Sequence, residues 1–388
     1  MSASCQRDCD LQSLHTLQLR SRASWFAKLS DPAELGGLRR FAQQHRLPIL
    51  PLGQGSNVIP RALVDALVVQ VALQGRRVLA ENNDTVLLEV AAGEDWQELV
   101  SLCVDQGWHG LENLALIPGV VGGAPIQNIG AYGVEIASCI DKVKLLPLDE
   151  KALADYADAK GWQRDASGTY LLSAAQCAFG YRDSIFKREL KHLCVIVAVV
   201  FRLRKRYLPV LDYPALAVYI NAVKANQARH KNTTTADDAK PTAREVFDAV
   251  VEIRRSKLPD PVTIPNAGSF FKNPLVNAGE AGALAARFPA LPIYQVEGKP
   301  AQKKLAAGWM IEYCGFKGNN TGDKSPACER AQVRETLLGM HAQQALVLVN
   351  HRPGVTSADD VLAFARRVSS AVELEFGVAL EIEPQILG

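Results

Sequence analysis

Apolar residues recur at two spacings in the region before Pro261, and together they predict alternating strands and helices. Short apolar runs predict strands at 47–52, 67–71, 86–91, 143–148 and 194–203. Apolar positions three and four residues apart predict helices at 35–45, 94–106 and 244–257. Prolines at 259 and 261 end the last helix, so we place a domain boundary there.

The C-terminal part shows the same two patterns. A helix is expected near 304–314, a strand at 345–350, and a long helix after Ser357, whose spacing to Asp360 is typical of a capping box. From 379 to 386, apolar and acidic residues alternate, which predicts a strand with Glu381 and Glu383 on one face.

Length and composition narrow the class of protein. The 388 residues are too many for one hydrophobic core and suggest two or three domains. Hydrophobic residues at 48% and charged residues at 22% are ordinary globular values. The net charge of +2 argues against nucleic-acid binding as the main function. The densest basic run, 202–206, is interpreted as the solvated end of a strand.

The eight cysteines form no Cys-x-x-Cys pair and no ligand spacing with histidine, so neither a metal site nor a disulfide framework is expected. The N-terminus lacks the apolar core of a signal peptide, and the longest apolar run, 195–201, is too short to cross a bilayer. A soluble, cytoplasmic protein is expected. The polar stretch 225–241 predicts a mobile, exposed insertion.

Residues 266–274 hold the densest set of chemically useful groups. Gly268 permits a sharp backbone approach, Phe270 and Phe271 exclude water, and Lys272 and Asn273 offer donors around Ser269. Taken alone, the stretch is equally typical of a polar turn that leads into a strand anchored by phenylalanine.

Two glycine-rich segments could bind a ligand through their backbones. Residues 53–57 follow a strand and could hold phosphate oxygens in an anion nest, although such a segment is more often a turn. The third glycine and the following helix of a dinucleotide fingerprint are absent. Residues 116–133 carry no charge, which favours close packing against something flat, or else a buried structural crossing.

Arg182 lies between aromatic neighbours, where a guanidinium can hold a carboxylate through paired donors. An exposed turn formed by Arg182 and Asp183 is the alternative. Several other polar residues could line a diphosphate and base pocket, but each is separately typical of a solvated surface: Lys257, Lys304, Lys317, Tyr213, Tyr294 and Gln344.

The order of these motifs resembles the UDP-N-acetylenolpyruvoylglucosamine reductase family over most of the chain, in its longer subtype with a tyrosine-bearing loop. The matching segments are 53–57, 110–112, 117–119, 125–133, 180–184, 257–261, 268–274 and 306–309. Residues 318–341 are longer and more charged than the family pattern. The resemblance implies an α+β fold: a flavin-binding fold of the vanillyl-alcohol-oxidase type in two α/β subdomains (1–72 with 381–388, and 73–258), and an α/β substrate domain (259–380).

By resemblance, the cofactor is non-covalent FAD and NADPH is the co-substrate. No histidine or cysteine for covalent attachment lies within either glycine-rich segment. The residues that would hold FAD are Gly53, Gln54, Gly55, Ser56, Asn57, Pro118, Gly119, Gly122, Gly123, Ala124, Ile126, Gln127, Asn128, Gly130, Tyr132 and Gly133.

The implied reaction reduces UDP-N-acetylglucosamine enolpyruvate to UDP-N-acetylmuramate for peptidoglycan synthesis. Ser269 would protonate C2 of the enolpyruvyl group, while Arg182 and Glu383 would polarise its carboxylate. Glu381 stays an alternative to Glu383. The implied substrate-binding residues are Tyr181, Tyr213, Arg254, Lys257, Asn273, Tyr294, Lys304, Lys317 and Gln344.

Two other functions remain open at this point: another FAD-dependent sugar or alcohol oxidoreductase of the same fold, and a non-catalytic UDP-sugar or flavin-binding regulator. An oxidase would not need the serine acid, and a regulator would not need Ser269, Arg182 and Glu383 together. No nucleic acid, membrane or metal partner is expected, and a monomer is expected.

Overall fold

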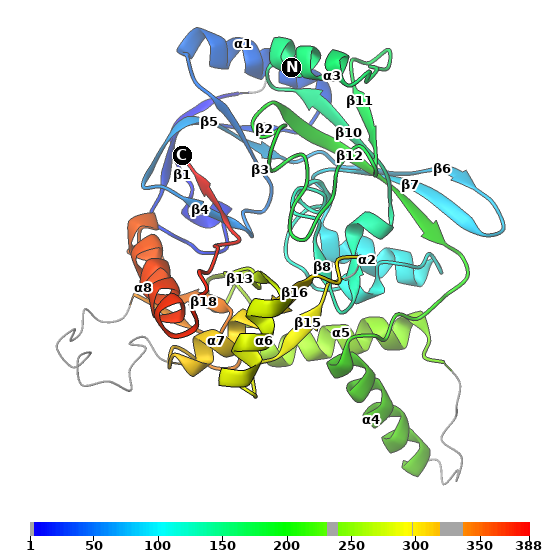
Figure 1. The fold of residues 1–388 in the computed structure, drawn as a ribbon. Coiled ribbons are helices and arrows are strands. Elements are labelled where there is room, and N and C mark those ends of the chain that lie inside the picture. The colour runs from blue at the N-terminus through cyan, green and yellow to red at the C-terminus, as the bar shows by residue number, and fades with distance from the viewer. Residues whose placement is uncertain (1–3, 231–239, 297, 319–336) are drawn as a thin grey trace. The chain divides into compact units, whose positions relative to one another are not determined.

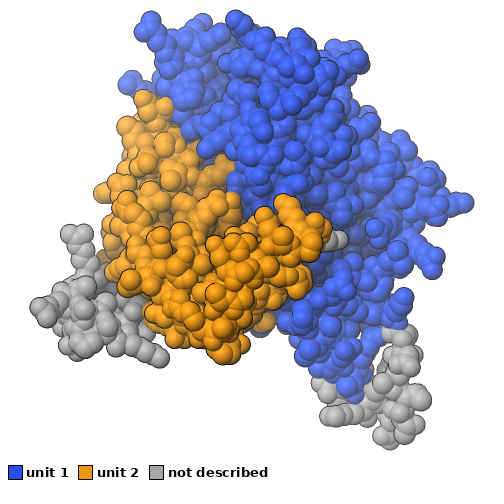
Figure 2. Space-filling model, in the orientation of Figure 1, with its two compact units in different colours: residues 1–7, 25–54, 66–256 blue, residues 8–24, 55–65, 257–388 orange. Residues whose placement is uncertain are grey.

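The computed structural model describes residues 4–230, 240–296, 298–318 and 337–388 (Figure 1). The chain divides into two compact units, coloured separately in Figure 2. Unit 1 comprises residues 1–7, 25–54 and 66–256, and unit 2 comprises residues 8–24, 55–65 and 257–388. Each unit is described by itself below.

A five-stranded antiparallel sheet of order β11-β10-β12-β7-β6 forms the centre of unit 1. Its strands are β6 (Arg76–Glu81), β7 (Thr85–Ala91), β10 (Ile140–Pro147), β11 (Tyr170–Ser173) and β12 (Cys194–Arg204). Residues 195–201 of β12 are all buried, which explains why this strand is apolar at successive positions instead of alternating. Figure 1 shows β6 and β7 in cyan as the hairpin at one edge of the sheet.

Unit 1 also contains most of the helices. They are α1 (Leu35–His45), α2 (Trp96–Asp105), α3 (Glu150–Ala159), α4 (Pro214–His230) and α5 (Ala243–Lys257), the last of which ends at the first residue of unit 2. Asp95 is the N-cap of α2, and its carboxylate accepts a hydrogen bond from the Glu98 N–H at 2.9 Å. This is ordinary N-capping, so the helix starts at Trp96 and not at Glu94, where the sequence placed it.

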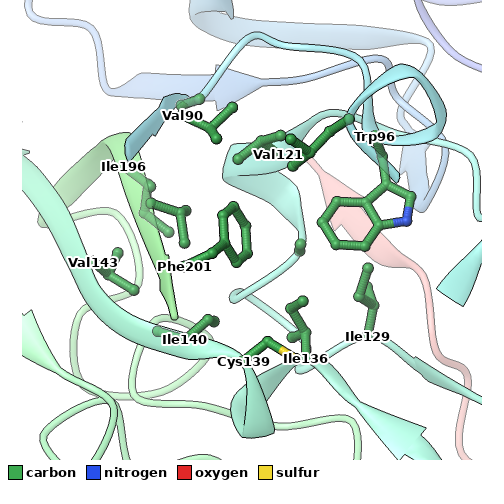
Figure 3. Packing of buried hydrophobic residues seen from close by; sticks show 14 of the residues in the cluster. Val90, Trp96, Val121, Ile129, Ile136, Cys139, Ile140, Val143, Ile196 and Phe201 are labelled. Carbon is green, nitrogen blue, oxygen red and sulfur yellow. The ribbon is translucent and has the colours of Figure 1, made fainter. Parts of the chain in front are cut away.

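The α2 face predicted from the sequence forms the core of unit 1 together with β12. The rings of Trp96 and Phe201 lie 6.2 Å apart, and Trp96 donates its indole N–H to the Leu114 carbonyl at 2.9 Å. Figure 3 shows Val121 in the same cluster. The glycine-rich segment is therefore anchored in the hydrophobic core through its first turn, η4 (Val121–Gly123).

A four-stranded sheet of order β1-β2-β5-β3 contains the strands in which the chain passes from one unit to the other. Its members are β1 (Gln6–Asp10), β2 (Arg22–Leu29), β3 (Ile49–Leu52) and β5 (Leu63–Val71). β3 and β5 are parallel, with Ile49 opposite Leu67. The short strands β8 (Gly130–Ala131) and β9 (Val134–Glu135) pair within unit 1.

Unit 2 contains three small sheets, of orders β13-β18-β17, β14-β16-β15 and β19-β4. Their strands are β4 (Val58–Pro60), β13 (Asn266–Ser269), β14 (Leu275–Asn277), β15 (Ile293–Gln295), β16 (Gln302–Leu305), β17 (Leu338–Met340), β18 (Val347–Asn350) and β19 (Gln385–Leu387). The described residues of this unit form the helices α6 (Ala278–Arg287), α7 (Ala307–Tyr313) and α8 (Ala358–Phe376). Phe270, Phe271 and Met310 belong to its core.

Most elements predicted from the sequence are confirmed, including the strands that became β3, β7, β10, β12 and β18 and the capping box of Ser357 and Asp360 that begins α8. Three predictions are wrong in part. Lys304 lies on β16 and not in the helix that follows it. The expected loop 225–241 begins as α4, which continues to His230. The expected strand 379–386 is reduced to β19 and a single bridge at Ile382.

Two further expectations lie mainly outside the described residues. They concern the rest of the 225–241 insertion, at 231–239, and most of the charged segment 318–341, at 319–336. Within the second segment, β17 is described and pairs with β18, with Gly339 opposite Val349.

Candidate active site

The loop 53–57 connects the two units along the chain and is shaped by two glycines. A Cβ on Gly53 would lie 2.7 Å from Cγ2 of Val120. Gly55 has a φ of +64°, and its Cβ would lie 2.3 Å from the carbonyl oxygen of Leu14. Neither glycine position has room for a side chain, so the backbone of the loop is uncovered at both. Gln54 donates its side-chain N–H to the second carboxylate oxygen of Asp95 at 2.9 Å, which ties the loop to the start of α2.

The second glycine-rich segment is packed on one side. A Cβ on Gly122 would lie 2.6 Å from the Ala92 Cβ, whereas that of Gly123 would have no atom of the described residues within 4 Å. Leu116, Asn128 and Tyr132 have left-handed φ values of +60°, +47° and +47°. Left-handed backbone in residues with side chains is uncommon and clusters at functional sites.

These features fit a flavin. The segment 116–133 is charge-free, and at Gly123 the backbone is open on the side away from the core. An apolar backbone surface suits a flat aromatic ring system, and the loop 53–57, whose backbone is uncovered at its two glycines, suits a phosphate group. The two segments predicted to hold FAD, 53–57 and 118–133, are therefore each compatible with that cofactor.

Three side chains join the glycine-rich segment to the loop 180–184. Asn128 is buried; its side-chain NH₂ donates to the Glu135 carboxylate at 2.7 Å and to the Gly180 carbonyl at 3.0 Å, and its Oδ1 accepts from the Ala137 N–H. The buried Ser184 hydroxyl donates to the Ile126 carbonyl at 2.5 Å. Arg182 donates to the Gly130 carbonyl at 2.5 Å. The two loops thus form one hydrogen-bonded assembly.

Arg182 and Arg254 are electrostatically coupled within unit 1. Burial lowers the pKa of Arg254; Tyr132 opposes this shift, while the Arg182 charge adds to it. Burial also raises the pKa of Tyr132. Arg254 lies on α5 and donates its Nε–H to the Leu116 carbonyl at 3.3 Å. Two neighbouring guanidinium groups raise each other's energy, so an anion placed beside them is stabilised.

An aromatic pair stands next to these cations. The rings of Tyr132 and Tyr213 meet edge to face with centroids 5.2 Å apart, and Tyr213 is 43% exposed. The Arg182 guanidinium lies 5.4 Å from the Tyr181 ring centre. Unit 1 therefore brings together five of the predicted residues: Tyr132, Tyr181, Arg182, Tyr213 and Arg254.

In unit 2, Ser269 ends β13 just after a bulge. β13 pairs with β18 through Asn266 opposite Val349 and Ser269 opposite Val347, with the register shift between them. Gly268 has a φ of +68° in that bulge, a conformation that favours glycine. Ser269 is exposed. Phe270 and Phe271 are fully buried with ring centres 5.1 Å apart, so they anchor the strand.

The structure separates the two candidate glutamates by burial. Glu383 is 9% exposed, and its backbone N–H donates to the Phe270 carbonyl at 2.8 Å. The Glu381 side chain is 71% exposed and forms an ion pair with Lys272. Glu383 is therefore buried and bonded to the residue that follows Ser269, whereas Glu381 faces solvent.

Four of the predicted substrate residues lie on or near the small sheet β14-β16-β15 and helix α7 of unit 2. Lys304 lies opposite both Tyr294 and Leu275 in register, so the sheet β14-β16-β15 presents the tyrosine and the lysine side by side. Lys317 pairs with Glu312 at 2.8 Å. Gln344 lies close to Gly308 of α7, because a Cβ there would be 3.2 Å from its Oε1.

Two other predicted substrate residues have specific surroundings. Asn273 accepts a hydrogen bond from the first N–H of α7, that of Ala307, at 3.0 Å. Lys257 is exposed at the end of α5.

Sequence reasoning missed residues that hold the site without facing it. Asn266 is buried; it donates to the carbonyls of Pro259 and Ile264 and accepts from the Gly268 N–H at 2.8 Å, which fixes the bulge before Ser269. Asp95 and Ser184 play similar parts for the loops of unit 1. The only signal in the sequence is their position inside or next to the motifs, because each makes at least one bond to a residue earlier in the chain: Asn266 to Pro259, Asp95 to Gln54 and Ser184 to Ile126.

The described residues contain neither a metal-binding cluster nor a membrane-spanning helix. Among them, no three histidine, cysteine or acidic side chains are grouped so that they could hold a metal ion. No helix there has the length and apolar character that crossing a membrane requires.

Comparison with family models finds two matches. Residues 23–152 match the model of an FAD binding domain, and residues 260–387 match the C-terminal domain of UDP-N-acetylenolpyruvoylglucosamine reductase. Among solved structures, the UDP-N-acetylenolpyruvylglucosamine reductase of Thermus caldophilus aligns over 100% of both chains with a TM-score of 0.58 and 20% identity, which supports the fold. The expected α+β, FAD-binding fold class is confirmed.

Curated relatives that match this chain over nearly their whole length have the same name as the C-terminal family model. UDP-N-acetylenolpyruvoylglucosamine reductase of Bordetella pertussis is 44% identical over 97% of this chain and 94% of its own. The enzyme of that name from Chromobacterium violaceum is 41% identical over 100% of both chains. Identity at this level over the full length, together with the flavin-compatible segments and the Ser269 bulge, places the chain in the UDP-N-acetylenolpyruvoylglucosamine reductase family.

Proposed function

We propose that Ser269, Glu383 and Arg182 carry out the reaction of this family in this chain, the NADPH-dependent reduction of UDP-N-acetylglucosamine enolpyruvate to UDP-N-acetylmuramate. The chain is an FAD-dependent oxidoreductase of peptidoglycan precursor synthesis. The observation that carries the residue assignment is the exposed Ser269 hydroxyl on a glycine bulge, paired through its strand with the segment of the buried Glu383.

The cofactor assignment rests on the two glycine-rich segments. Residues 53–57 would hold the pyrophosphate, and 118–133 would lie against the ring system, where bound FAD supplies hydride transfer between NADPH and the substrate. Asn128 has both side-chain hydrogens engaged within the protein, so its role here is to shape the segment and not to contact the ring.

Ser269 is proposed to protonate C2 of the enolpyruvyl group after hydride reaches C3. Ser269 is an exposed residue at the end of a strand whose next two residues are buried, so its backbone is fixed while the residue stays accessible. A rigidly placed acid needs no reorganisation when the proton moves. No histidine in a recognisable activating motif accompanies it, which argues against a nucleophilic serine.

Negative charge builds at C2 and spreads into the substrate carboxylate during hydride addition. Arg182 is proposed to hold this carboxylate, because a guanidinium offers paired donors and the positive charge of Arg254 lies in the same surroundings. Glu383, if held protonated in its buried setting, would donate a hydrogen bond to the same charge. The UDP portion is assigned to Tyr181, Tyr213, Lys257, Asn273, Tyr294, Lys304, Lys317 and Gln344.

The family's three-part division is also proposed here: residues 1–72 with 381–388, residues 73–258, and a substrate domain of 259–380. We propose that the enzyme works in the cytoplasm as a monomer of 42.1 kDa.

Anaerobic mixing tests the assignment. NADPH should bleach the flavin absorbance of the holoenzyme, and the enolpyruvyl substrate should restore it; bleaching without recovery contradicts the reductase.

In Ser269→Ala, bleaching should stay near normal while recovery slows by about 10²- to 10⁴-fold, the usual contribution of a general acid. Ser167→Ala, which removes an exposed turn hydroxyl bonded to Asp165, serves as the control. Equal loss in both half-reactions of Ser269→Ala would make Ser269 structural.

A further inference from the structure

One buried amide in unit 1 joins two segments that the proposed function uses separately. Asn113 is 3% exposed and lies in the turn η3 (Glu112–Leu114). Its side-chain NH₂ donates to the Tyr132 carbonyl at 2.8 Å and to the Val210 carbonyl at 2.9 Å. Both amide hydrogens are therefore used, and both acceptors are backbone atoms outside η3.

Each acceptor belongs to a segment whose tyrosine is assigned to the site. Tyr132 has a left-handed φ of +47°, and the adjacent Gly133 has a φ of +85°, with its Cβ position 3.5 Å from Cγ1 of Val210. Three residues after Val210, Tyr213 places its ring against that of Tyr132. The backbones meet at Val210 through Asn113, and the rings meet at Tyr213.

The turn that carries Asn113 is held in place without it. Leu111 and Leu114 are fully buried, and the Leu114 carbonyl accepts the Trp96 indole N–H at 2.9 Å. The Glu112 carboxylate accepts from the Gly110 N–H at 2.8 Å and contacts Nδ1 of His109 at 3.1 Å. Loss of the Asn113 amide would therefore release its two acceptors while η3 stays anchored.

We infer that Asn113 is a positioning residue: it fixes Val210, in the segment 205–213 between β12 and α4, to the Tyr132 backbone and so sets Tyr213 for the nucleotide portion of the substrate. This inference rests on the proposed role of Tyr213. Asn113 does not touch substrate in this account. It restricts where Tyr213 can go, so that less ordering is needed when the substrate binds.

A double-mutant cycle in the FAD-loaded enzyme tests this. Asn113→Ala should raise KM for UDP-N-acetylglucosamine enolpyruvate about tenfold, the scale of one or two lost buried hydrogen bonds, with flavin content unchanged. Tyr213→Ala should raise KM by at least as much. In the double variant KM should match that of Tyr213→Ala, because a residue that acts only through Tyr213 has nothing left to position.

Asn350→Ala is the matched control. Asn350 is 1% exposed and donates to the Leu17 carbonyl at 2.7 Å in unit 2, so its loss also removes a buried amide. Its effect on KM, if any, should add to that of Tyr213→Ala. Additive effects for Asn113 and Tyr213 would overturn the inference while leaving the role of Tyr213 intact. An unchanged KM in Tyr213→Ala alone would overturn both.

Hydrogen exchange keeps the inference testable if Asn113→Ala loses flavin. Asn113→Ser retains one donor in a smaller side chain, and the backbone amides of 208 and 210–213 should exchange faster in it than in the unmodified holoenzyme, while those of α2 keep their protection. Equal exchange at 208 and 210–213 in both proteins would contradict the inference.

Discussion

Glu381 and Glu383 are separated by one residue yet have opposite surroundings. Glu383 is buried beside the Ser269 strand, and Glu381 forms an exposed ion pair with Lys272. We expect Glu383→Gln to slow substrate-driven flavin reoxidation by about 10²- to 10³-fold, as loss of one preorganised group does. Glu381→Gln should leave that rate within about twofold, because exposed ion pairs contribute about 0–1 kcal/mol.

Stopped-flow absorbance of the second half-reaction measures both variants, and flavin reduction by NADPH is the internal reference. If Glu381→Gln lost the larger factor, the carboxylate assignment would move to residue 381.

The sequence could identify both glutamates as candidates but could not rank them. Their alternation predicts one shared face of a strand, whereas the strand pairing here is a single bridge between Phe271 and Ile382, and Pro384 follows. Which of the two glutamates is buried then depends on the segment around Phe270 and Lys272, more than 100 positions earlier in the chain. Gly268 shows the opposite case: a glycine before the candidate serine predicts unusual backbone, and its left-handed φ confirms this.

At the scale of elements, the N-terminus of α7 is capped by a side chain from another segment. Its own N-cap residue, Ala306, has no side-chain acceptor, and Asn273 accepts the Ala307 N–H instead. Asn273→Ala should lower the free energy of unfolding by about 1 kcal/mol, as for other lost caps. Asn273→Asp should retain that stability, because a carboxylate also accepts the bond and suits a helix N-terminus.

The Asp variant separates capping from substrate binding. If the amide N–H also contacts the UDP group, as proposed, Asn273→Asp should keep its thermal midpoint but raise KM, since it places a negative charge near a diphosphate. An unchanged KM in that variant would restrict Asn273 to capping.

Elements with continuous local patterns were predictable, and those set by distant pairing were not. β12 and α8 follow from an apolar run and a capping box. The residues around Lys304 and Leu305 fit a helical pattern by spacing, but pairing with β14 and β15 makes them a strand. In the same way, helix α4 extends into a stretch whose composition alone is typical of a loop.

At the scale of the molecule, the chain changes unit inside strands as well as at the Pro-rich stop. β2 and β5 each contain residues of both units, and only the change after Ser256 falls near the predicted boundary. Composition marks a boundary where a linker is polar or rich in proline. It carries no signal where a strand continues from one unit into the next, because no linker separates the two parts of that strand.

The buried His15 makes the stability of unit 2 depend on pH. It is 4% exposed, its Nδ1 finds no partner among the described residues, and burial lowers its pKa to about 4 from an ordinary value of 6.5. The nearby Asp10 only partly offsets this shift. The folded protein therefore binds fewer protons than the unfolded chain between these two pKa values, so stability is lost as pH falls through this window.

Between pH 7 and pH 5 this group alone should remove about 2 kcal/mol from the free energy of unfolding, at about 1.36 kcal/mol per unit of pKa shift. His15→Leu puts an apolar side chain of similar size in the place of the imidazole beside Gly55, and it cannot titrate. Urea unfolding of the two proteins at pH 7 and pH 5 measures the difference. The variant should lose less stability than the unmodified protein, and parallel losses would mean that other groups, such as paired carboxylates, carry the acid sensitivity.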